Sequence, residues 1–245
     1  MARRRHARLP MTDYGPIRAF YRSQARLYQR LVARQDHRGE LLAALNEIVA
    51  LAGLLVVEFG AGTGNLTSKL VGAAARVHAF DLEPSMLALA RPQLLASGSA
   101  SWSLAAADNG RMPVASNCAD LAIEAWSFVY VLDWQPDDWR KLVDQLLAEM
   151  QRVVKPGGIA ILVEDLGIGR CQPAAPTADM ARLYAHWQER HRFQCSWIRT
   201  DYQFASPVEA DELARLFFGD DLLERRLRPH DLTLPECTGI WWKRF

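Results

Sequence analysis

The sequence predicts an α/β fold built on a mostly parallel, seven-stranded sheet with helices on both faces. Short apolar runs that are typical of buried parallel strands recur along the chain. Segments of helical periodicity separate these runs, which is the pattern of βαβ units with parallel neighbouring strands. The chain has 245 residues, of which 50% are hydrophobic, and this suffices for one large domain with a sizeable core.

Each expected strand is a short apolar or alternating segment that ends close to glycine, proline or polar residues. The seven expected strands are residues 54–59, 76–81, 102–106, 121–126, 159–165, 197–204 and 238–245. Helices are expected in front of and between them, over residues 17–32, 39–51, 65–71, 84–97, 137–154, 180–192 and 208–218.

Four parts are expected along the chain. Residues 1–16 form a basic tail, which we expect to be disordered because short charged termini rarely pack. Residues 17–51 form N-terminal helices that are candidates for a lid, and residues 52–166 form the ligand-binding core. Residues 167–245 are expected to complete the sheet and to add a small cap.

Composition excludes several classes of partner. The formal net charge of +1 argues against duplex DNA, and no apolar run approaches the roughly 18 residues of a transmembrane helix. No apolar stretch of a secretory signal follows the arginine-rich start. The four cysteines are far apart without a C-x-x-C pair, so neither a disulfide framework nor a zinc site is expected. These features favour a cytoplasmic protein without a membrane or nucleic-acid partner. The protein is expected to be a monomer or a homodimer.

A glycine-rich loop at residues 60–64, Gly-Ala-Gly-Thr-Gly, follows the first expected strand. Glycine is needed where the backbone turns sharply and where a ligand approaches the main chain. The dinucleotide fingerprint G-x-G-x-x-G would place a glycine at position 65, where Asn65 stands. Glu58, two residues before the loop, would repel a pyrophosphate but suits a cationic ligand. The loop therefore disfavours a nicotinamide or flavin dinucleotide.

Four segments together resemble the motifs of class I S-adenosylmethionine-dependent methyltransferases. E-F-G-A-G-T-G-N at 58–65 resembles the first motif, and V-H-A-F-D-L-E-P-S-M-L at 77–87 the second. A-D-N-G-R-M-P-V at 107–114 resembles the third, and R-V-V-K-P-G-G at 152–158 the segment before the fifth strand. The resemblance covers roughly residues 50–165. It implies a Rossmann-like domain of the small-molecule, type-11-like kind, with S-adenosylmethionine as cofactor.

The resemblance also implies a set of cofactor contacts. The methionine part of the cofactor would lie over the glycine loop, with its cationic end near Glu58. The ribose hydroxyls would donate to Asp81. The adenine would lie among the residues that follow the second and third expected strands. The implied residues are Glu58, Gly60, Ala61, Gly62, Asp81, Leu82, Met86, Asp108, Asn109 and Trp126.

Some of these contacts have alternatives. Asp81 could instead cap the next helix, Asp108 could be a turn residue, and Trp126 could be core packing. The sequence also departs from the family at Ala107 and Asn109, where a glycine and a small residue are usual. The departures bear on the adenine contacts and not on the class of cofactor.

No catalytic residue is assigned, because methyl transfer by in-line displacement depends mainly on alignment and a dry pocket. A general base is needed only for an acceptor that arrives protonated. Candidates near the carboxyl ends of the fourth and fifth strands and in the cap are Tyr130, Asp133, Glu164, Asp165, His186 and His191. Each could instead be a surface or capping residue. His186 and His191 are five apart on one expected helix and would point in different directions, so no metal site is predicted.

The first helix carries Tyr21 and Tyr28, which lie two turns apart. In related small-molecule methyltransferases an N-terminal helix with tyrosines closes over the cofactor, although such a helix can also simply pack on the sheet. The expected function is methyl transfer to O, N or C of a small-molecule substrate. Two alternatives stay open: a methyltransferase acting on protein or tRNA, and a non-catalytic S-adenosylmethionine-binding partner subunit.

Overall fold

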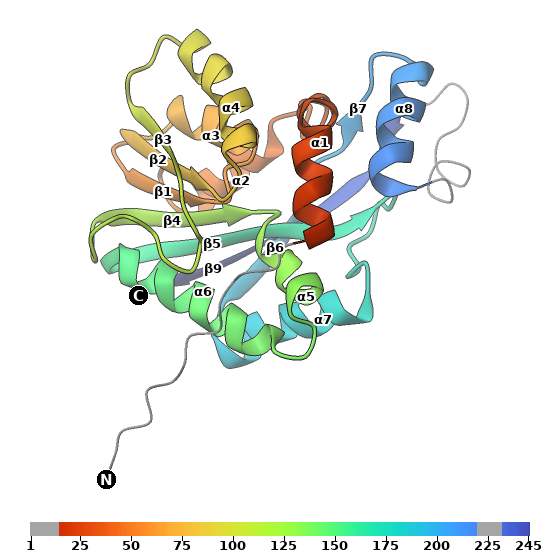
Figure 1. Cartoon of the computed structure of the whole chain (residues 1–245). Coiled ribbons are helices and arrows are strands. Elements are labelled where there is room, and N and C mark those ends of the chain that lie inside the picture. The colour runs from red at the N-terminus through yellow and green to blue at the C-terminus, as the bar shows by residue number, and fades with distance from the viewer. Residues whose placement is uncertain (1–14, 220–231) are drawn as a thin grey trace.

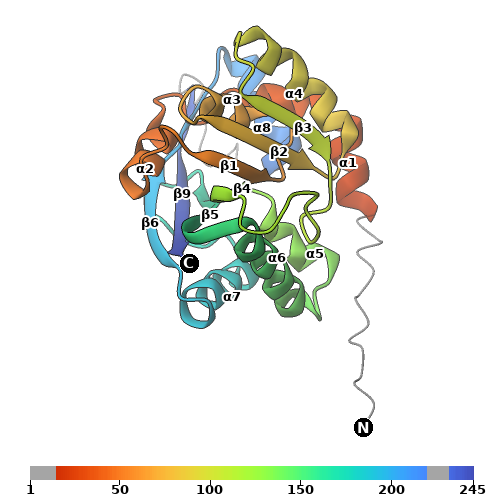
Figure 2. The ribbon, with the colours of Figure 1, turned by 90° about the vertical axis from the view of Figure 1, so that its left-hand side faces the viewer.

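The computed structural model describes residues 15–219 and 232–245, and these form a seven-stranded sheet with helices on both faces (Figures 1 and 2). The strand order is β3-β2-β1-β4-β5-β9-β6. The predicted fold class is therefore confirmed. Residues 1–14 of the predicted basic tail lie outside the described residues. The helix α1 begins at Gly15.

Five parallel strands form the first part of the sheet. They are β1 (Leu55–Phe59), β2 (Arg76–Asp81), β3 (Trp102–Ala106), β4 (Ala119–Ala125) and β5 (Val154–Ile168). The chain leaves β1 toward β2 on one side and returns to β4 on the other, so the strand order reverses between β1 and β4. In open α/β sheets a ligand crevice forms at such a reversal, outside the carboxyl ends of the strands.

The last part of the sheet is antiparallel. β9 (Glu236–Arg244) lies between β5 and β6 (Gln194–Arg199) and runs against both. The predicted strand over 197–204 is split, because β7 (Tyr202–Gln203) leaves the sheet and pairs with β8 (Thr233–Leu234). The break lies at Asp201, whose Oδ1 accepts the backbone N–H of Glu236 at 3.0 Å.

Helices cover the two faces of the sheet in separate sets (Figure 2). One face is covered by α2 (Glu40–Ile48), α3 (Asn65–Val71) and α4 (Pro84–Ala96), and the other by α6 (Trp139–Val153) and α7 (Ala178–Ala185). The buried side chains of α6 recur at helical spacing, and they are Trp139, Leu142, Val143, Leu146, Leu147, Met150 and Val153. Full burial of each such side chain is worth about 1.5–3 kcal/mol, so this stripe fixes α6 against the sheet.

α1 (Gly15–Val32) belongs to neither layer and lies between α4 and α8 (Pro207–Phe218) (Figure 1). Gln29 donates to the carbonyl of Leu89 on α4 at 3.2 Å. Arg30 forms two hydrogen bonds with Glu212 of α8, at 2.9 and 3.1 Å. α1 therefore links the ligand-binding half of the fold to the C-terminal part.

Within the described part of the chain, no helix is long and apolar enough to cross a membrane.

Candidate functional site

The loop after β1 turns sharply because three of its residues have left-handed backbone conformations. Gly60, Gly62 and Gly64 have φ angles of 75°, 54° and 83°. A Cβ on Gly60 would lie 2.6 Å from the Cβ of Ser127, and one on Gly64 would lie 2.9 Å from the Cβ of Ala90. Only glycine meets both requirements at these positions. The G-x-G-x-G spacing is therefore a consequence of backbone conformation and close packing.

β2 holds the glycine loop in place. The backbone N–H of Ala61 donates to the carbonyl of Phe80 at 2.8 Å, and that of Gly62 donates to Oδ2 of Asp81 at 2.8 Å. Oδ1 of Asp81 accepts the N–H of Glu83 at 2.8 Å. The carboxylate thus connects the loop to the start of α4 and also faces the cleft. Glu83 is the N-cap residue of α4 and no side chain caps the helix, so Asp81 does not have the helix-capping role considered as an alternative.

The carboxyl ends of β1, β2 and β4 surround a cleft of ≈ 960 Å³, counting its mouth open to solvent. Nine of the ten predicted cofactor residues line it, namely Glu58, Gly60, Ala61, Gly62, Asp81, Leu82, Met86, Asn109 and Trp126. Asp108 is not among the lining residues. Its Oδ1 accepts the N–H of Gly110 at 2.7 Å, which is the turn role considered as its alternative.

Glu58 is a buried carboxylate in the wall of this cleft, with 2% of its surface exposed. Burial raises the pKa of Glu58 to about 7, the Asp81 carboxylate adds to the rise, and the Thr67 hydroxyl opposes it. Oε2 of Glu58 accepts no hydrogen bond from the residues that the structure describes. A buried acceptor without a partner is unfavourable. A cationic ligand group would supply the missing partner, so the chemistry of this wall fits S-adenosylmethionine.

Two further buried polar atoms in the cleft wall lack a partner among the described residues, Oδ1 of Asn109 and Nε1 of Trp126. Trp126 directly follows β4 and has a φ of 53°, a conformation that is strained for a residue with a side chain. The cleft wall therefore offers a ligand both a hydrogen-bond acceptor, from Asn109, and a donor, from Trp126.

Aromatic side chains form the wall opposite the glycine loop. Tyr21 and Tyr28 of α1 pack edge to face with ring centroids 5.0 Å apart. The Tyr21 hydroxyl contacts the hydroxyl of Tyr130, and Tyr130 stacks on Trp134 at 5.9 Å. The 3₁₀ turn η1 (Phe128–Tyr130) and the short helix α5 (Val131–Trp134), neither of which the sequence predicted, carry the last two rings. Tyr21, Tyr28, Tyr130 and Trp134 all line the cleft.

Sequence reasoning did not assign nine of the lining residues to the site, namely Val32, Gln35, Thr63, Asn65, Leu66, Glu83, Ala125, Ser127 and Trp134. Val32 and Gln35 follow the tyrosines at helical spacing, so the periodicity of α1 could have indicated Val32. Gln35 donates through Nε2 to the buried Oε2 of Glu236 at 2.7 Å, a contact between residues 201 positions apart. No local signal predicts such a contact.

Of the candidate general bases, Tyr130 alone lines the cleft. Asp133 is exposed on α5, and Oδ1 of Asp165 accepts the N–H of Gly167 at 2.5 Å. Glu164 is buried at 1% exposure and accepts the N–H of Val129 at 3.0 Å. His186 and His191 both contact Asp144 on α6, outside the cleft lining.

Tyr130 is poorly suited to act as a base. Burial raises its pKa well above the ordinary value of 10.0, and the neighbouring Tyr21, Tyr28 and Glu164 add to the rise. Burial likewise raises the pKa of Tyr21 and of Tyr28. These hydroxyls stay protonated at neutral pH, so they are available to donate hydrogen bonds to a bound acceptor.

Glu124 stands inside an apolar strand and has hydrogen-bond partners for one of its two carboxylate oxygens, whereas its Oε1 lacks a partner among the described residues. Its Oε2 accepts the N–H groups of Ser127 and Phe128, each at 3.2 Å, and the Ser127 hydroxyl at 3.0 Å. Burial raises the pKa of Glu124 to about 8, against these hydrogen bonds. Glu124 therefore organises the turn between β4 and Tyr130.

Comparison with known proteins gives one family for the central part of the chain. Residues 56–158 match the model of a family described as "Methyltransferase domain". Among curated relatives, the ubiquinone/menaquinone biosynthesis C-methyltransferase UbiE of Hahella chejuensis is 29% identical over 57% of this chain and 58% of its own length. The malonyl-[acyl-carrier protein] O-methyltransferase of Pectobacterium atrosepticum is 32% identical over 54% of this chain and 46% of its own. The chain spans about half the length of these relatives.

Two solved structures share the fold over most of the chain. The cyclase SpnF matches with a TM-score of 0.63 and 16% identity, over 93% of this chain and 95% of its own. A SAM-dependent methyltransferase from Aquifex aeolicus matches with a TM-score of 0.54 and 14% identity, over 90% of this chain and 97% of its own. At these identities the likeness concerns the fold alone.

The strand order, the reversal between β1 and β4 and the glycine loop define a Rossmann-like α/β domain. The match to the family described as "Methyltransferase domain" covers residues 56–158 of this domain, which is the part of the chain that carries the motifs of the sequence resemblance.

Proposed function

We propose that the protein transfers the methyl group of S-adenosylmethionine to a small-molecule acceptor by in-line displacement. The observation that carries the proposal is the buried Glu58 carboxylate, whose Oε2 lacks a partner among the described residues and which stands beside three left-handed glycines. A permanently cationic ligand suits this wall, and a pyrophosphate does not. S-adenosylmethionine supplies an electrophilic methyl carbon and loses its positive charge as the new bond forms.

The residues of the β1–β2 edge bind the cofactor in this proposal. Gly60, Ala61 and Gly62 lie under its methionine part, because no side chain blocks the approach to the backbone there. Glu58 faces its cationic end. Asp81 accepts from the ribose hydroxyls, since its carboxylate lines the cleft and each of its two oxygens can accept more than one hydrogen bond.

The adenine lies among Leu82, Met86 and Asn109, all of which line the cleft. Asp108 contributes indirectly in this proposal, by shaping the turn that presents Asn109. Trp126 borders the cofactor on the β4 side.

The acceptor lies against the aromatic wall of Tyr21, Tyr28, Tyr130 and Trp134, which favours a small planar molecule. The three tyrosine hydroxyls stay protonated, so they orient the acceptor and do not remove its proton. The acceptor therefore brings a nucleophile that is ionised or carries no proton to lose, such as a phenolate, an enolate-type carbon or a neutral amine. The C- and O-methyltransferases among the curated relatives are compatible with such acceptors.

We also infer a cytoplasmic location and no nucleic-acid partner. All four cysteines are free thiols, which suits a reducing compartment. The net charge of +1 provides no bulk attraction to a polyanion.

Calorimetry of the full chain tests the cofactor assignment. We expect binding of S-adenosylhomocysteine and S-adenosylmethionine and no binding of NADH. Tight NADH binding without any binding of S-adenosylhomocysteine would refute the assignment.

Incubation of the protein with methyl-labelled S-adenosylmethionine and a cell extract tests the acceptor class. Label in the small-molecule fraction supports the proposal. Label confined to protein or RNA replaces the small-molecule acceptor by a macromolecule, and cofactor binding without turnover in any fraction favours a non-catalytic subunit.

A further inference from the structure

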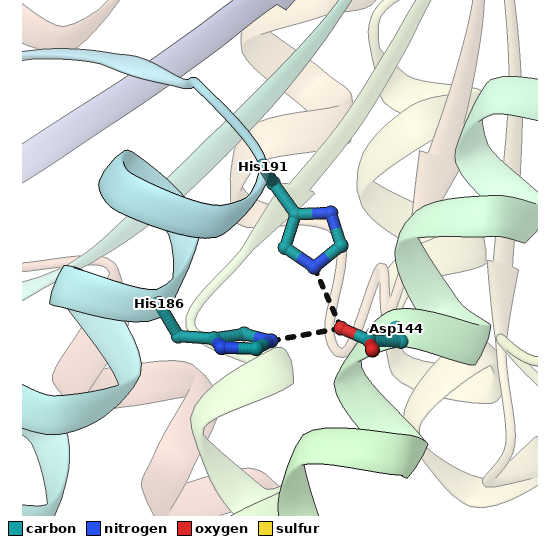
Figure 3. Close-up of side chains that lie close together, drawn as sticks. All are labelled: Asp144, His186 and His191. Atoms are coloured by element: carbon teal, nitrogen blue, oxygen red, sulfur yellow. Dashed lines mark hydrogen bonds and ion pairs between the residues drawn. The ribbon is translucent and has the colours of Figure 1, made fainter.

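Three side chains meet between α6 and the end of α7, outside the methyltransferase cleft (Figure 3). Nε2 of His186 lies 2.8 Å from Oδ1 of Asp144, and Nε2 of His191 lies 2.6 Å from the same oxygen. The three potential ligand atoms lie within 4.8 Å of one another. This arrangement corrects the prediction that the two histidines point in different directions.

The reason for the correction is a change of helix type. Residues five apart in an α-helix are separated by about 140° around the axis. After α7, however, the chain continues as a π-helical turn, η2 (His186–Arg190), in which the N–H of His191 donates to the carbonyl of His186 at 3.3 Å. A hydrogen bond between residues five apart brings their side chains to one side, and here the ring centroids lie 5.0 Å apart.

Two uncommon backbone features produce this placement. π-helical turns are rare and are found frequently at functional sites. Arg192, which comes directly after His191, has a left-handed φ of 63°. Such conformations persist where the surroundings hold them.

We propose that Asp144, His186 and His191 form a binding site for a divalent transition-metal ion, for which zinc is the best suited. Two imidazole nitrogens and a carboxylate oxygen are a ligand set that zinc accepts, with water at the remaining position. Ligand atoms around tetrahedral zinc lie about 3.3 Å apart. The observed spacings of 2.8 and 2.6 Å need to widen by only roughly half an ångström.

The exposure of the site allows an ion to enter. The Asp144 side chain is 42% exposed, whereas those of His186 and His191 are 13% and 21% exposed. Trp139 packs edge to face on the His186 ring at 5.4 Å and limits its motion. Lys243 is the charged neighbour that opposes binding at His191, and the Asp144 carboxylate offsets it.

The ion would take no part in methyl transfer. The three residues do not line the cleft, and they join α6 to the segment that contains α7 and η2. That segment also contacts β5, since the Tyr184 hydroxyl donates to the carbonyl of Asp165 at 2.7 Å. Metal binding would therefore fix the C-terminal cap segment to the helical layer, and its readouts are separate from methyl transfer.

The experiment uses the full chain without an affinity tag, freed of metal by chelation and dialysis and titrated with ZnCl₂. We expect one ion per chain and a raised Tm on zinc addition. Asp144→Asn and His191→Gln should each weaken zinc binding by at least about 100-fold, because each removes one of three ligands. Asp144→Asn keeps an oxygen that accepts from an imidazole, so the fold should be preserved. His37→Gln is the matched control, since His37 is exposed and its ring contacts the backbone carbonyl of Asp201.

Cobalt provides a readout in the unmodified protein. We expect Co²⁺ to give visible d–d bands without a thiolate charge-transfer band. A thiolate band would place the ion on a cysteine and overturn the proposal. No zinc binding by the unmodified chain, or equal binding by Asp144→Asn, would overturn it as well. None of these outcomes bears on cofactor binding in the cleft.

Discussion

Two neighbouring pairs of parallel strands carry acidic side chains toward the carboxyl ends of the sheet, and these two stretches, named the β1–β2 edge and the β4–β5 edge, use them differently. At the β1–β2 edge, Glu58 and Asp81 line the cleft. At the β4–β5 edge, Glu124 and Glu164 are absent from the lining and accept backbone N–H groups of the turn 127–129. The difference lies in the segment after each strand: a glycine loop leaves space for a ligand after β1, whereas η1 folds back over the carboxylates after β4.

At the β4–β5 edge, burial and mutual proximity change the ionisation of the two carboxyl groups. Burial raises the pKa of both Glu124 and Glu164, and the proximity of Glu124 adds to the rise at Glu164. Two buried carboxyl groups in contact with one turn are therefore not both ionised at neutral pH. The β4–β5 edge supports Tyr130, while the β1–β2 edge offers charge to a ligand. Substitutions at the two edges should therefore differ in their effects on cofactor binding.

The largest effect is expected at the glycine loop. Gly60→Ala should weaken S-adenosylhomocysteine binding by more than about 100-fold, because the new Cβ would meet the Ser127 Cβ at 2.6 Å and displace the loop. Gly53→Ala is the matched control, since its φ of 84° is equally left-handed but nothing lies within 4 Å of the added Cβ. It should lower the free energy of unfolding by about 1 kcal/mol and leave binding unchanged. Calorimetry of both variants decides, and equal affinities would remove the loop from the binding site.

The next effect separates Asp81 from Asp108. Asp81→Ala should weaken cofactor binding by roughly 30- to 100-fold, since two hydrogen bonds to a charged acceptor are worth about 1.5–3 kcal/mol each and water replaces them in part. Asp108→Ala should change it only a few-fold, because Asp108 contacts Gly110 and does not line the cleft. Dissociation constants measured by calorimetry test the order. Equal losses would contradict the proposed role of Asp81.

The next predictions test whether the N-terminal helix α1 acts as a lid over the cleft. Residues 17–32 should gain protection from hydrogen exchange when S-adenosylhomocysteine is added, because Tyr21 and Tyr28 line the cleft. Tyr21→Phe should lower methyl transfer by about 10-fold through loss of the hydroxyl contact with Tyr130. Removal of residues 1–30 should leave a folded protein that binds the cofactor poorly and transfers no methyl group. Equal protection with and without ligand would make α1 a packed structural helix.

The same contrast explains which parts of the site the sequence predicts. The glycine loop and the end of β2 are predictable because left-handed turns and strand ends depend on local residues, and nine predicted residues line the cleft. The contact between Tyr21 and Tyr130 joins residues 109 positions apart, so it depends on how α1 crosses the sheet edge. The pairing of His186 with His191 depends on a π-helical turn that helical periodicity does not reveal. Backbone conformations that local residues require can be predicted from the sequence, whereas the tertiary placement of the aromatic wall cannot.

The smallest effect concerns pH and distinguishes Glu58 from Glu124. In the free protein the pKa of Glu58 is raised to about 7, and a bound sulfonium should lower it by favouring the carboxylate. Binding of S-adenosylmethionine below pH 7 then requires loss of a proton, so affinity should rise by roughly 8-fold between pH 6 and 7.5. The free energy of unfolding of the free protein should instead fall as the pH rises. Folding raises the pKa of the Glu58 carboxyl from the ordinary value of 4.5 to about 7. Such a group stabilises the folded state at low pH, and this contribution is lost as the pH rises from about 4.5 to 7.

Glu58→Gln should remove most of the pH dependence of affinity, because the variant carries no titrating group at this position. Glu124→Gln is the matched control, because Glu124 is also buried and its pKa is raised to about 8. Unlike Glu58, it accepts hydrogen bonds from the turn before Tyr130 and does not line the cleft. It should keep the pH dependence of affinity and reduce the fall in stability between pH 5 and 8. Calorimetric titrations at several pH values, with thermal unfolding of the free proteins, measure both quantities. A pH dependence of affinity that survives Glu58→Gln and disappears in Glu124→Gln would move the ligand's charge contact from the β1–β2 edge to the β4–β5 edge.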